Sequence, residues 1–222
     1  MADLPSFATL ARRPDAHLDQ LALALAGEFG AVDAAAALAT LDTVGAELAE
    51  LVRAGVGRTP GAEARACATL LGDQLGFAGD REHYDDPDNS MLDRVLSRRR
   101  GLPIALSVVY VEVARRAGVA LQGVGLPGHF VVGHFGATPP LVLDPFAGGA
   151  PVPGDHPEQL VRPWSAHEIA MRMLNNLVGS FQRRGNVGAA IRAGELRLAL
   201  PAEEALQDAL RTELRSMQAR LN

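Results

Sequence analysis

The spacing of apolar residues changes along the chain, and this change constrains the fold more than any other feature. In the first half and again from Trp164 onward, apolar residues recur every three or four positions, as on one face of a helix. Between these parts, the segments ALQGVGL, HFVVGHF and PLVLD are short, rich in β-branched residues and separated by Gly or Pro, which is typical of strands. The pattern predicts a mostly helical α+β fold in which a small antiparallel sheet packs on the preceding helix.

The N-terminal half predicts several helices joined by one polar loop. Two amphipathic helices come first, and a third is expected from about Glu63 to Leu75, ending at Gly76. The stretch GFAGDREHYDDPDNSM then predicts an irregular loop, followed by a short helix from Met91 for which the adjacent Asn89-Ser90 pair can provide a cap.

We expect this polar loop to be ordered. The loop and the basic run that follows it both precede the core helix, and the family resemblance described below implies that they are part of one module. We predict that an acidic side chain from the loop pairs with an arginine of the run. The acidic candidates are Asp85, Asp86 and Asp88, and the arginines are Arg98, Arg99 and Arg100.

The core helix is expected from Pro103 to Gly118. Proline suits the first turn of a helix, glycine suits its end, and Arg115 and Arg116 in the last turn match the helix dipole. The C-terminal part predicts two helices joined at Arg184-Gly185-Asn186.

Small residues, Ala190 and Gly194, are expected on the facing stripe of this pair, as in a tetratricopeptide hairpin. A final helix is expected to begin at Pro201, with an apolar stripe that extends to Leu221.

The composition limits the class of protein. A charged fraction of 21% and a hydrophobic fraction of 48% are ordinary for a globular protein. A net charge of -5 predicts no nucleic-acid partner, and the apolar stretches are too short to predict a membrane span. The single cysteine, Cys67, excludes an intramolecular disulfide and favours a cytoplasmic location.

Two polar residues stand at the ends of neighbouring predicted strands. A hairpin turning over Gly136 to Pro139 places His129 and Asp144 at the same end of the sheet, within about two ladder positions. This suits a carboxylate that orients an imidazole. The structural alternatives are a strand-end histidine bonded to backbone and an aspartate that closes an Asp-Pro turn. His134 lies an odd number of residues from His129 and points to the opposite face, so we expect no metal site here.

The sequence also resembles a known family. The run GDREHYDDPDNSMLDRVLSRRRGLPIALSVVYVEVARRAGVALQGVGLPGHFVV, followed by LVLDPFAGG, is similar to the SirB-type transglutaminase-like family over roughly residues 60 to 200. The resemblance implies a transglutaminase-like, papain-like core joined to a tetratricopeptide-like segment. In that superfamily, a cysteine at the first turn of a core helix faces a histidine and an aspartate on neighbouring antiparallel strands. His129 and Asp144 match the two strand positions.

The resemblance also implies a division of the chain into three parts. We expect an N-terminal helical segment over residues 1–60, a transglutaminase-like core over 61–163, and a helical, tetratricopeptide-like segment over 164–222.

The nucleophile of that superfamily is missing. The first turn of the core helix contains Pro103, Ile104, Ala105 and Leu106, none of which is nucleophilic. Cys67 belongs to a separate, earlier helix, and we expect it to be a small core residue. The nearest hydroxyl is that of Ser107, which can act as a nucleophile or donate back to the carbonyl of Pro103. Tyr110 lies on the same flank and can donate a hydrogen bond or belong to the core.

Two functions fit these observations. The first is a non-catalytic transglutaminase-like module in which a cleft beside His129 and Asp144 and the helical C-terminal segment bind a peptide or protein, with Pro103, Ala105 and Tyr110 as the binding residues. The alternative is a hydrolase or peptidase in which His129 and Asp144 act as base and orienter on Ser107 or on water. We expect no metal and no cofactor, because the acidic loop lacks the spaced ligands of an EF-hand and GLPGHF lacks the lysine of a phosphate loop. The oligomeric state does not follow from the sequence.

Overall fold

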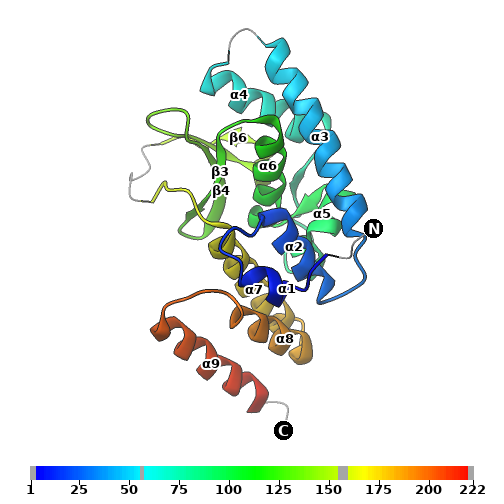
Figure 1. Cartoon of the computed structure of the whole chain (residues 1–222), viewed down its shortest axis with the longest axis vertical. Helices are drawn as coiled ribbons and strands as arrows, with labels where there is room; N and C mark the ends of the chain where they lie inside the picture. Colours follow the sequence, from blue (N-terminus) through cyan, green and yellow to red (C-terminus); the bar gives the residue numbers. More distant parts are fainter. Residues whose placement is uncertain (1–3, 56–57, 155–159, 220–222) are drawn as a thin grey trace.

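A computed structural model describes residues 4–55, 58–154 and 160–219 of the 222-residue chain. Its helices are α1 (Phe7–Ala11), α2 (Leu18–Gly27), α3 (Ala34–Ala54), α4 (Pro60–Cys67), α5 (Leu92–Arg98), α6 (Pro103–Ala117), α7 (Ala166–Arg183), α8 (Val187–Arg197) and α9 (Glu204–Ala219). Its strands are β1 (Ala78–Gly79), β2 (Arg100–Gly101), β3 (Leu121–Leu126), β4 (His129–His134), β5 (Leu141–Asp144) and β6 (Ala150–Pro151). Helices, then a sheet, then helices follow one another along the chain, which confirms the predicted α+β class (Figure 1).

Shorter helical pieces complete the chain. The predicted helix from about residue 63 to 75 is α4 continued by a π-helical segment, η1 (Ala68–Gln74), and it ends at Gly76 with a positive φ of 74°. Two 3-10 turns, η2 (Pro87–Ser90) and η3 (Pro145–Ala147), follow the polar loop and β5 respectively.

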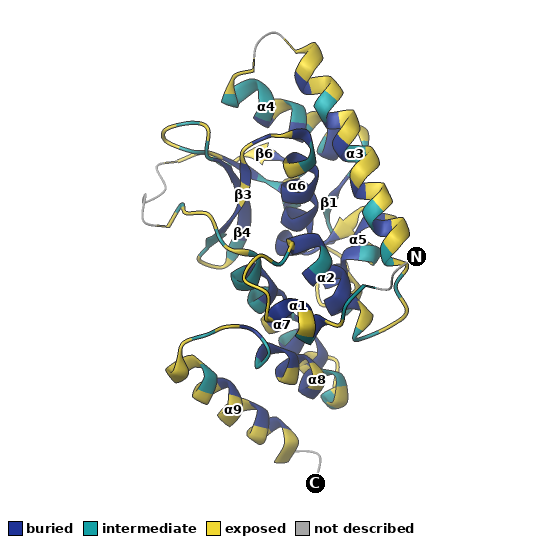
Figure 2. Cartoon of the chain, viewed as in Figure 1, coloured by how far each residue is buried: buried dark blue, intermediate teal, exposed yellow. Residues whose placement is uncertain are grey.

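Helix α6 lies at the centre of the molecule. It begins at Pro103, as predicted, and ends at Gly118, whose φ of 71° is a left-handed conformation that glycine adopts without strain. It packs against α3 on one side and against β3 and β4 on the other. Figure 2 shows that α6 is buried over almost its whole length, because both sides are covered.

The main sheet has the strand order β3-β4-β5-β6, with every neighbouring pair antiparallel. Side chains along a strand alternate between its two faces. In β4, Phe130 and Val132 belong to the main core, whereas Val131 joins Val124 and Val142 in a separate small apolar cluster. The sheet therefore separates a large core, which includes α6, from a small one.

A buried ionic network joins α6 to the N-terminal helices. The guanidinium of Arg116 donates to Asp19 Oδ2 at 2.6 Å, to Glu112 Oε2 at 2.8 Å and to Asp42 Oδ1 at 2.6 Å. Burial and the charge of Asp19 raise the pKa of Glu112. Burial also acts to raise the pKa of Asp19, but the hydrogen bond and charge of Arg116 outweigh it and hold that pKa below its usual value. At Gly45 an added Cβ would lie 2.5 Å from the Cβ of Arg116, so glycine leaves room for the arginine.

The start of α5 differs from the prediction. The residue that caps α5 is Met91, and no side chain caps the helix. Asn89 instead donates from its side chain to the carbonyl of His83 at 2.7 Å. The hydroxyl of Ser90 is buried and has no hydrogen-bond partner among the described residues. The predicted cap was wrong because Asn89 bonds to the loop and Ser90 makes no cap hydrogen bond among the described residues.

The C-terminal helices pack in sequence, α7 on α8 and α8 on α9. Ala190 is buried as expected, but an added Cβ at Gly194 would meet Met217 at 2.8 Å, so Gly194 faces α9 and not α7. Helix α9 begins at Glu204, three residues after Pro201. Leu221 lies outside the described residues.

The predicted division at residues 60 and 163 stays a prediction, and both of its outer ends, residues 1 and 222, lie outside the described part of the chain. Among the described residues, every helix is too short or too polar to cross a membrane.

Candidate functional site

The two predicted strand-end residues meet. The register pairs Val132 with Leu143, which places His129 two positions from the residue opposite Asp144. His129 Nε2 lies 3.1 Å from Asp144 Oδ2, and the two side chains are 34% and 20% exposed. The second carboxylate oxygen of Asp144 accepts the backbone N–H of Phe146 at 2.9 Å. The carboxylate is therefore fixed from two directions, and Nδ1 is the imidazole nitrogen that Asp144 leaves available.

An aromatic group adjoins this pair. The ring of Phe146 lies edge-to-face with the His129 ring at 6.5 Å and with the Tyr84 ring at 6.0 Å. The guanidinium of Arg81 lies over the Phe146 ring, 5.2 Å from its centroid. The Phe146 ring rests on the backbone of Gly79, where an added Cβ would lie 2.3 Å from the ring. An exposed cation and a half-exposed tyrosine thus lie beside the His129–Asp144 pair.

The start of α6 offers no reactive side chain. Pro103 and Ala105 are buried, and the Ser107 hydroxyl is buried and donates to the Pro103 carbonyl at 2.8 Å. This is the structural alternative for Ser107, and among the described residues no hydrogen bond joins Ser107 to His129. Its role as a nucleophile stays a prediction that no contact supports.

The predicted binding residues are likewise enclosed. Tyr110 is fully buried, and its hydroxyl has no hydrogen-bond partner among the described residues. Burial raises the pKa of this hydroxyl, and the nearby Cys67, Asp73 and Asp144 raise it further. Because Pro103, Ala105 and Tyr110 are all buried, their predicted contact with a ligand stays a prediction.

Cys67 ends α4 and is fully buried. Burial, together with the charge of Glu63, raises the pKa of its thiol to about 12. A thiol with this pKa holds almost no thiolate at neutral pH, so Cys67 lacks the form that attacks a carbonyl.

His134 points away from His129, as the odd spacing predicts. It is 1% exposed, and its Nε2 lies 2.9 Å from Glu63 Oε2, so the pair joins β4 to α4. Within the described ranges, no three side chains of His, Cys, Asp or Glu are placed to hold a metal ion.

The ion pair predicted for the polar loop is present. Arg98 Nη1 lies 3.9 Å from Asp86 and 3.5 Å from Asp88, and Arg98 Nη2 donates to Asp80 at 3.3 Å. Strand β1, near the start of the loop, pairs in parallel with β2, which includes Arg100 of the basic run. Asp85, the third acidic candidate, instead accepts from Arg183 of α7.

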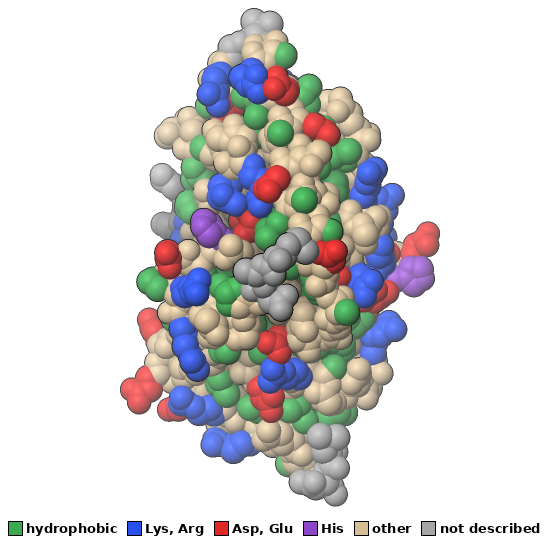
Figure 3. Space-filling model, turned by 45° about the vertical axis from the view of Figure 1, so that its right-hand side comes forward, with side chains coloured by type: hydrophobic (Ala, Val, Ile, Leu, Met, Phe, Trp, Pro, Cys, Tyr) green, Lys and Arg blue, Asp and Glu red, His purple; other side chains and the backbone are tan. Residues whose placement is uncertain are grey.

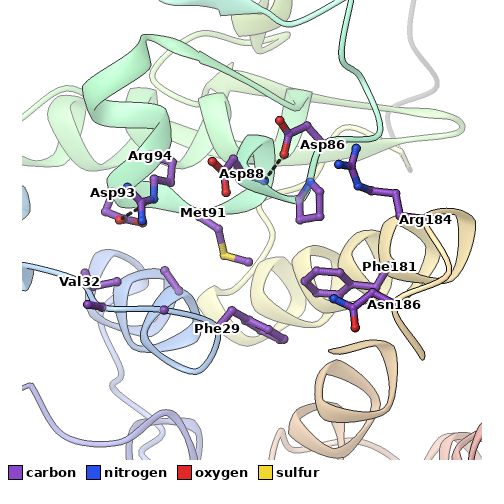
Figure 4. Close-up of a pocket in the computed structure, with 14 residues that line it drawn as sticks. Phe29, Val32, Asp86, Asp88, Met91, Asp93, Arg94, Phe181, Arg184 and Asn186 are labelled. Carbon is purple, nitrogen blue, oxygen red and sulfur yellow. Dashed lines mark hydrogen bonds and ion pairs between the residues drawn. The ribbon is translucent and has the colours of Figure 1, made fainter. Parts of the chain in front are cut away.

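The loop also borders a pocket of about 420 Å³ (Figure 4). Its lining comes mainly from the segment between α2 and α3, from the loop with the start of α5, and from the end of α7. The rings of Phe29, before α3, and Phe181, of α7, lie 5.2 Å apart at its base, with Met91 close by. Asp86 and Asp88 stand on the opposite wall. The loop is therefore held between the N-terminal and C-terminal helices.

The wider surface carries charges of both signs. On the face drawn in Figure 3, arginine side chains and acidic side chains are interspersed. Mixed charge of this kind provides no large field of one sign on that face.

Comparison with known proteins gives the family of this chain. A family model for the transglutaminase-like superfamily matches residues 35–177, which include α6, His129 and Asp144. The chain belongs to the transglutaminase-like superfamily. No solved structure gave a match.

Curated relatives match over part of their length. A UPF0162 protein of Xylella fastidiosa strain Temecula1 is 36% identical over 155 residues, which is 61% of this chain and 55% of the relative. A UPF0162 protein of Xylella fastidiosa strain 9a5c is 45% identical over 96 residues, 43% of this chain and 34% of the relative. F-box only protein 21 of Mus musculus is 32% identical over 133 residues, 52% of this chain and 21% of the relative. The chain thus spans about half or less of the length of these relatives.

Sequence reasoning missed the residues around the pair. Phe146 carries a local signal, because it follows Asp144-Pro145 at the end of a strand. Arg81 and Tyr84 carry none, since the polar loop that holds them has no periodicity to place its side chains.

Proposed function

We propose that this chain is a non-catalytic transglutaminase-like module that binds a peptide or protein beside His129 and Asp144. One observation carries the proposal: the histidine and aspartate are paired, whereas the first turn of α6 has no nucleophile. Acyl transfer through a thioester needs a thiolate, and the one thiol is buried with a raised pKa.

The surroundings of the pair support a binding role. Tyr84 is 47% exposed, Arg81 is exposed, and both contact Phe146 beside His129. Tyrosine and arginine are enriched in the centres of protein interfaces, because each combines a large contact area with hydrogen-bond donors. The site suits a peptide that presents an apolar or aromatic side chain to Phe146 and Tyr84, and an acceptor to Arg81.

Three finer features are part of the proposal. The resemblance of the long run of residues 79–132 favours the SirB-type branch of the superfamily. The close packing of α7 on α8 supports a tetratricopeptide-like hairpin. A single buried cysteine suits a cytoplasmic location.

A hydrolase is the second candidate, and the His129–Asp144 geometry is the observation that favours it. With Nε2 held by Asp144, Nδ1 can accept a proton from a water molecule. The buried, bonded hydroxyl of Ser107 makes water the better nucleophile of the two in this reading.

The first experiment separates binding from catalysis. Wild type, His129→Ala and His17→Ala are assayed for incorporation of a fluorescent amine into a glutamine-containing protein, and for hydrolysis of activated esters and peptides. The sequence contains no lysine, so the chain supplies no lysine amine of its own and the added amine is required. His17 is exposed at the start of α2 and makes no cap hydrogen bond, which makes it a matched control. We expect no turnover by any of the three. Turnover by wild type and His17→Ala that is absent from His129→Ala would reject the non-catalytic proposal and establish the second candidate.

The second experiment tests the binding surface. Peptides are selected from a random display library on the immobilised chain, and their affinities are measured for wild type, Tyr84→Ala and Leu206→Ala. Both residues are about half exposed, so neither substitution should disturb the fold, and Leu206 lies on α9. We expect Tyr84→Ala to weaken the selected peptides about tenfold or more, as for an interface hot spot, and Leu206→Ala to have no effect. Selected peptides that bind both variants like wild type would place binding elsewhere.

A further inference from the structure

A second concave surface lies at the edge of the sheet, apart from the His129–Asp144 pair. It is an apolar groove of about 770 Å³ between the α4–η1 segment and β5–β6, and neither His129 nor Asp144 lines it. Helix α4 and β6 stand in the upper part of Figure 1. The size falls within the range of pockets that bind small molecules.

The walls of the groove are mainly apolar. They include Ala64, Ala68, Leu141, Leu143, Val152 and Val161. Leu141 is 38% exposed, although it is a large apolar residue in a strand. Apolar surface gathered in a concave site is typical of a ligand groove, whereas single exposed apolar residues are common on any protein.

Polar groups are few in this groove, and they favour an anion. Among the described residues that line it, Arg65 is the one charged side chain, and it is exposed on α4. Thr69 and Thr138 add hydroxyls. A guanidinium forms two parallel hydrogen bonds with a carboxylate, which fixes the head of such a ligand more firmly than a single point charge does.

Gly149 forms part of the inner wall of the groove and has a special backbone conformation. Its φ of 83° is left-handed, and an added Cβ there would lie 2.9 Å from the Cα of Ala68 and 3.0 Å from the Tyr110 hydroxyl. Ala68 and Gly149 both line the groove, so the Tyr110 hydroxyl, which has no hydrogen-bond partner within the described ranges, lies directly behind its wall. Glycine at position 149 therefore lets this part of the chain pack closely against Ala68 and Tyr110.

An added peptide strand fits this edge less well than a small molecule does. The outermost strand, β6, is two residues long, and its second residue, Pro151, has no N–H to donate. Proline on an edge strand opposes pairing with another chain.

We propose that the groove binds an apolar carboxylate of the fatty-acid class, with its chain against Leu141 and Val161 and its carboxylate on Arg65. The proposal rests on the groove alone and does not depend on the function proposed for the His129–Asp144 pair.

The test uses decanoate and the uncharged decan-1-ol, titrated into the whole chain by isothermal calorimetry below the concentration at which decanoate forms micelles. The groove variants are Arg65→Gln and Leu141→Asp. The matched controls are Arg53→Gln and Leu51→Asp, exposed residues of α3 outside the groove.

We expect wild type to bind decanoate at one site. Arg65→Gln should weaken decanoate about tenfold, the effect of a lost charge-assisted hydrogen bond, and should leave decan-1-ol unchanged. Leu141→Asp should weaken both ligands, because it places a carboxylate against the apolar chain. The two α3 variants should bind like wild type.

Other outcomes would overturn the proposal. They are the absence of saturable decanoate binding, equal affinity in wild type and both groove variants, and equal loss in the α3 controls. A wild-type dimer that Leu141→Asp dissociates without ligand, measured by sedimentation, would show instead that a second copy of the chain covers the groove.

Discussion

Replacing Arg116 with Met removes one of the two cations that the buried carboxylates of Asp19 and Glu112 share. The other cation, Arg115, lies 3.3 Å from Asp19 and 2.7 Å from Glu112, but its side chain is 46% exposed. The side chains of Asp19 and Glu112 are 4% and 2% exposed, and both accept hydrogen bonds from Arg116. Breaking a buried ion pair by removing one partner costs about 3 to 5 kcal/mol, because the other charge stays buried. The third acceptor, Asp42, is 68% exposed, and a pair of this kind contributes about 1 kcal/mol or less. We therefore expect a large loss for Arg116→Met and a small one for Asp42→Asn.

The two buried carboxylates should respond to pH in opposite ways. The lowered pKa of Asp19 contributes stability that is present above the ordinary aspartate pKa of 3.8 and is lost as the pH falls through the lowered value. The raised pKa of Glu112 contributes stability that is present below the ordinary glutamate pKa of 4.5 and is lost as the pH rises through the raised value. At neutral pH, Asp19→Asn should thus be more destabilising than Glu112→Gln.

The assay is urea unfolding of wild type and the four variants at neutral pH and at about pH 4, with the free energy taken from the midpoint and the slope. For a chain of this length, a loss of 3 to 5 kcal/mol lowers the melting temperature by about 10 °C. An Arg116→Met loss no larger than that of Asp42→Asn would refute the idea that the network stabilises α6. A greater loss in Glu112→Gln than in Asp19→Asn at neutral pH would refute the assigned pKa directions.

Three further predictions concern single positions. Cys67, fully buried with a pKa near 12, should react with iodoacetamide in native protein far more slowly than in urea, as followed by mass spectrometry; equal rates would show an accessible thiolate. Arg98→Gln should speed proteolysis within the polar loop, because Arg98 contacts Asp80, Asp86 and Asp88; an unchanged cleavage rate would mean that these contacts do not hold the loop. Gly149→Ala should lower the free energy of unfolding by about 1 to 3 kcal/mol, because its backbone is left-handed and its Cβ position is filled, and a thermal melt identical to wild type would contradict this.

The parts of the fold that the sequence predicts are those with a long, local signal. Helix α6 has proline at its start, glycine at its end and apolar residues between them, and all three signals agree. Strands β1 and β2 were missed, because two residues cannot show a period and their pairing joins positions 22 residues apart.

Of the candidate site, too, one part could be predicted from local sequence signals and another part could not. A hairpin fixes its own register, so the meeting of His129 and Asp144 could be predicted from two adjacent strands. The position of Tyr84 depends on how a distant loop packs on η3, and the burial of Ala105 depends on the elements that surround α6, neither of which a local pattern contains.

Helix α9 packs chiefly on α8, through Leu210, Leu214 and Met217, and much of its remaining surface is exposed in Figure 2. A helix with so small a buried face can detach in a local opening that needs far less free energy than unfolding of the whole chain. Its amides should then exchange with deuterium well before those of α6. Each such opening would expose to solvent the stripe of α8 around Gly194, which α9 otherwise covers.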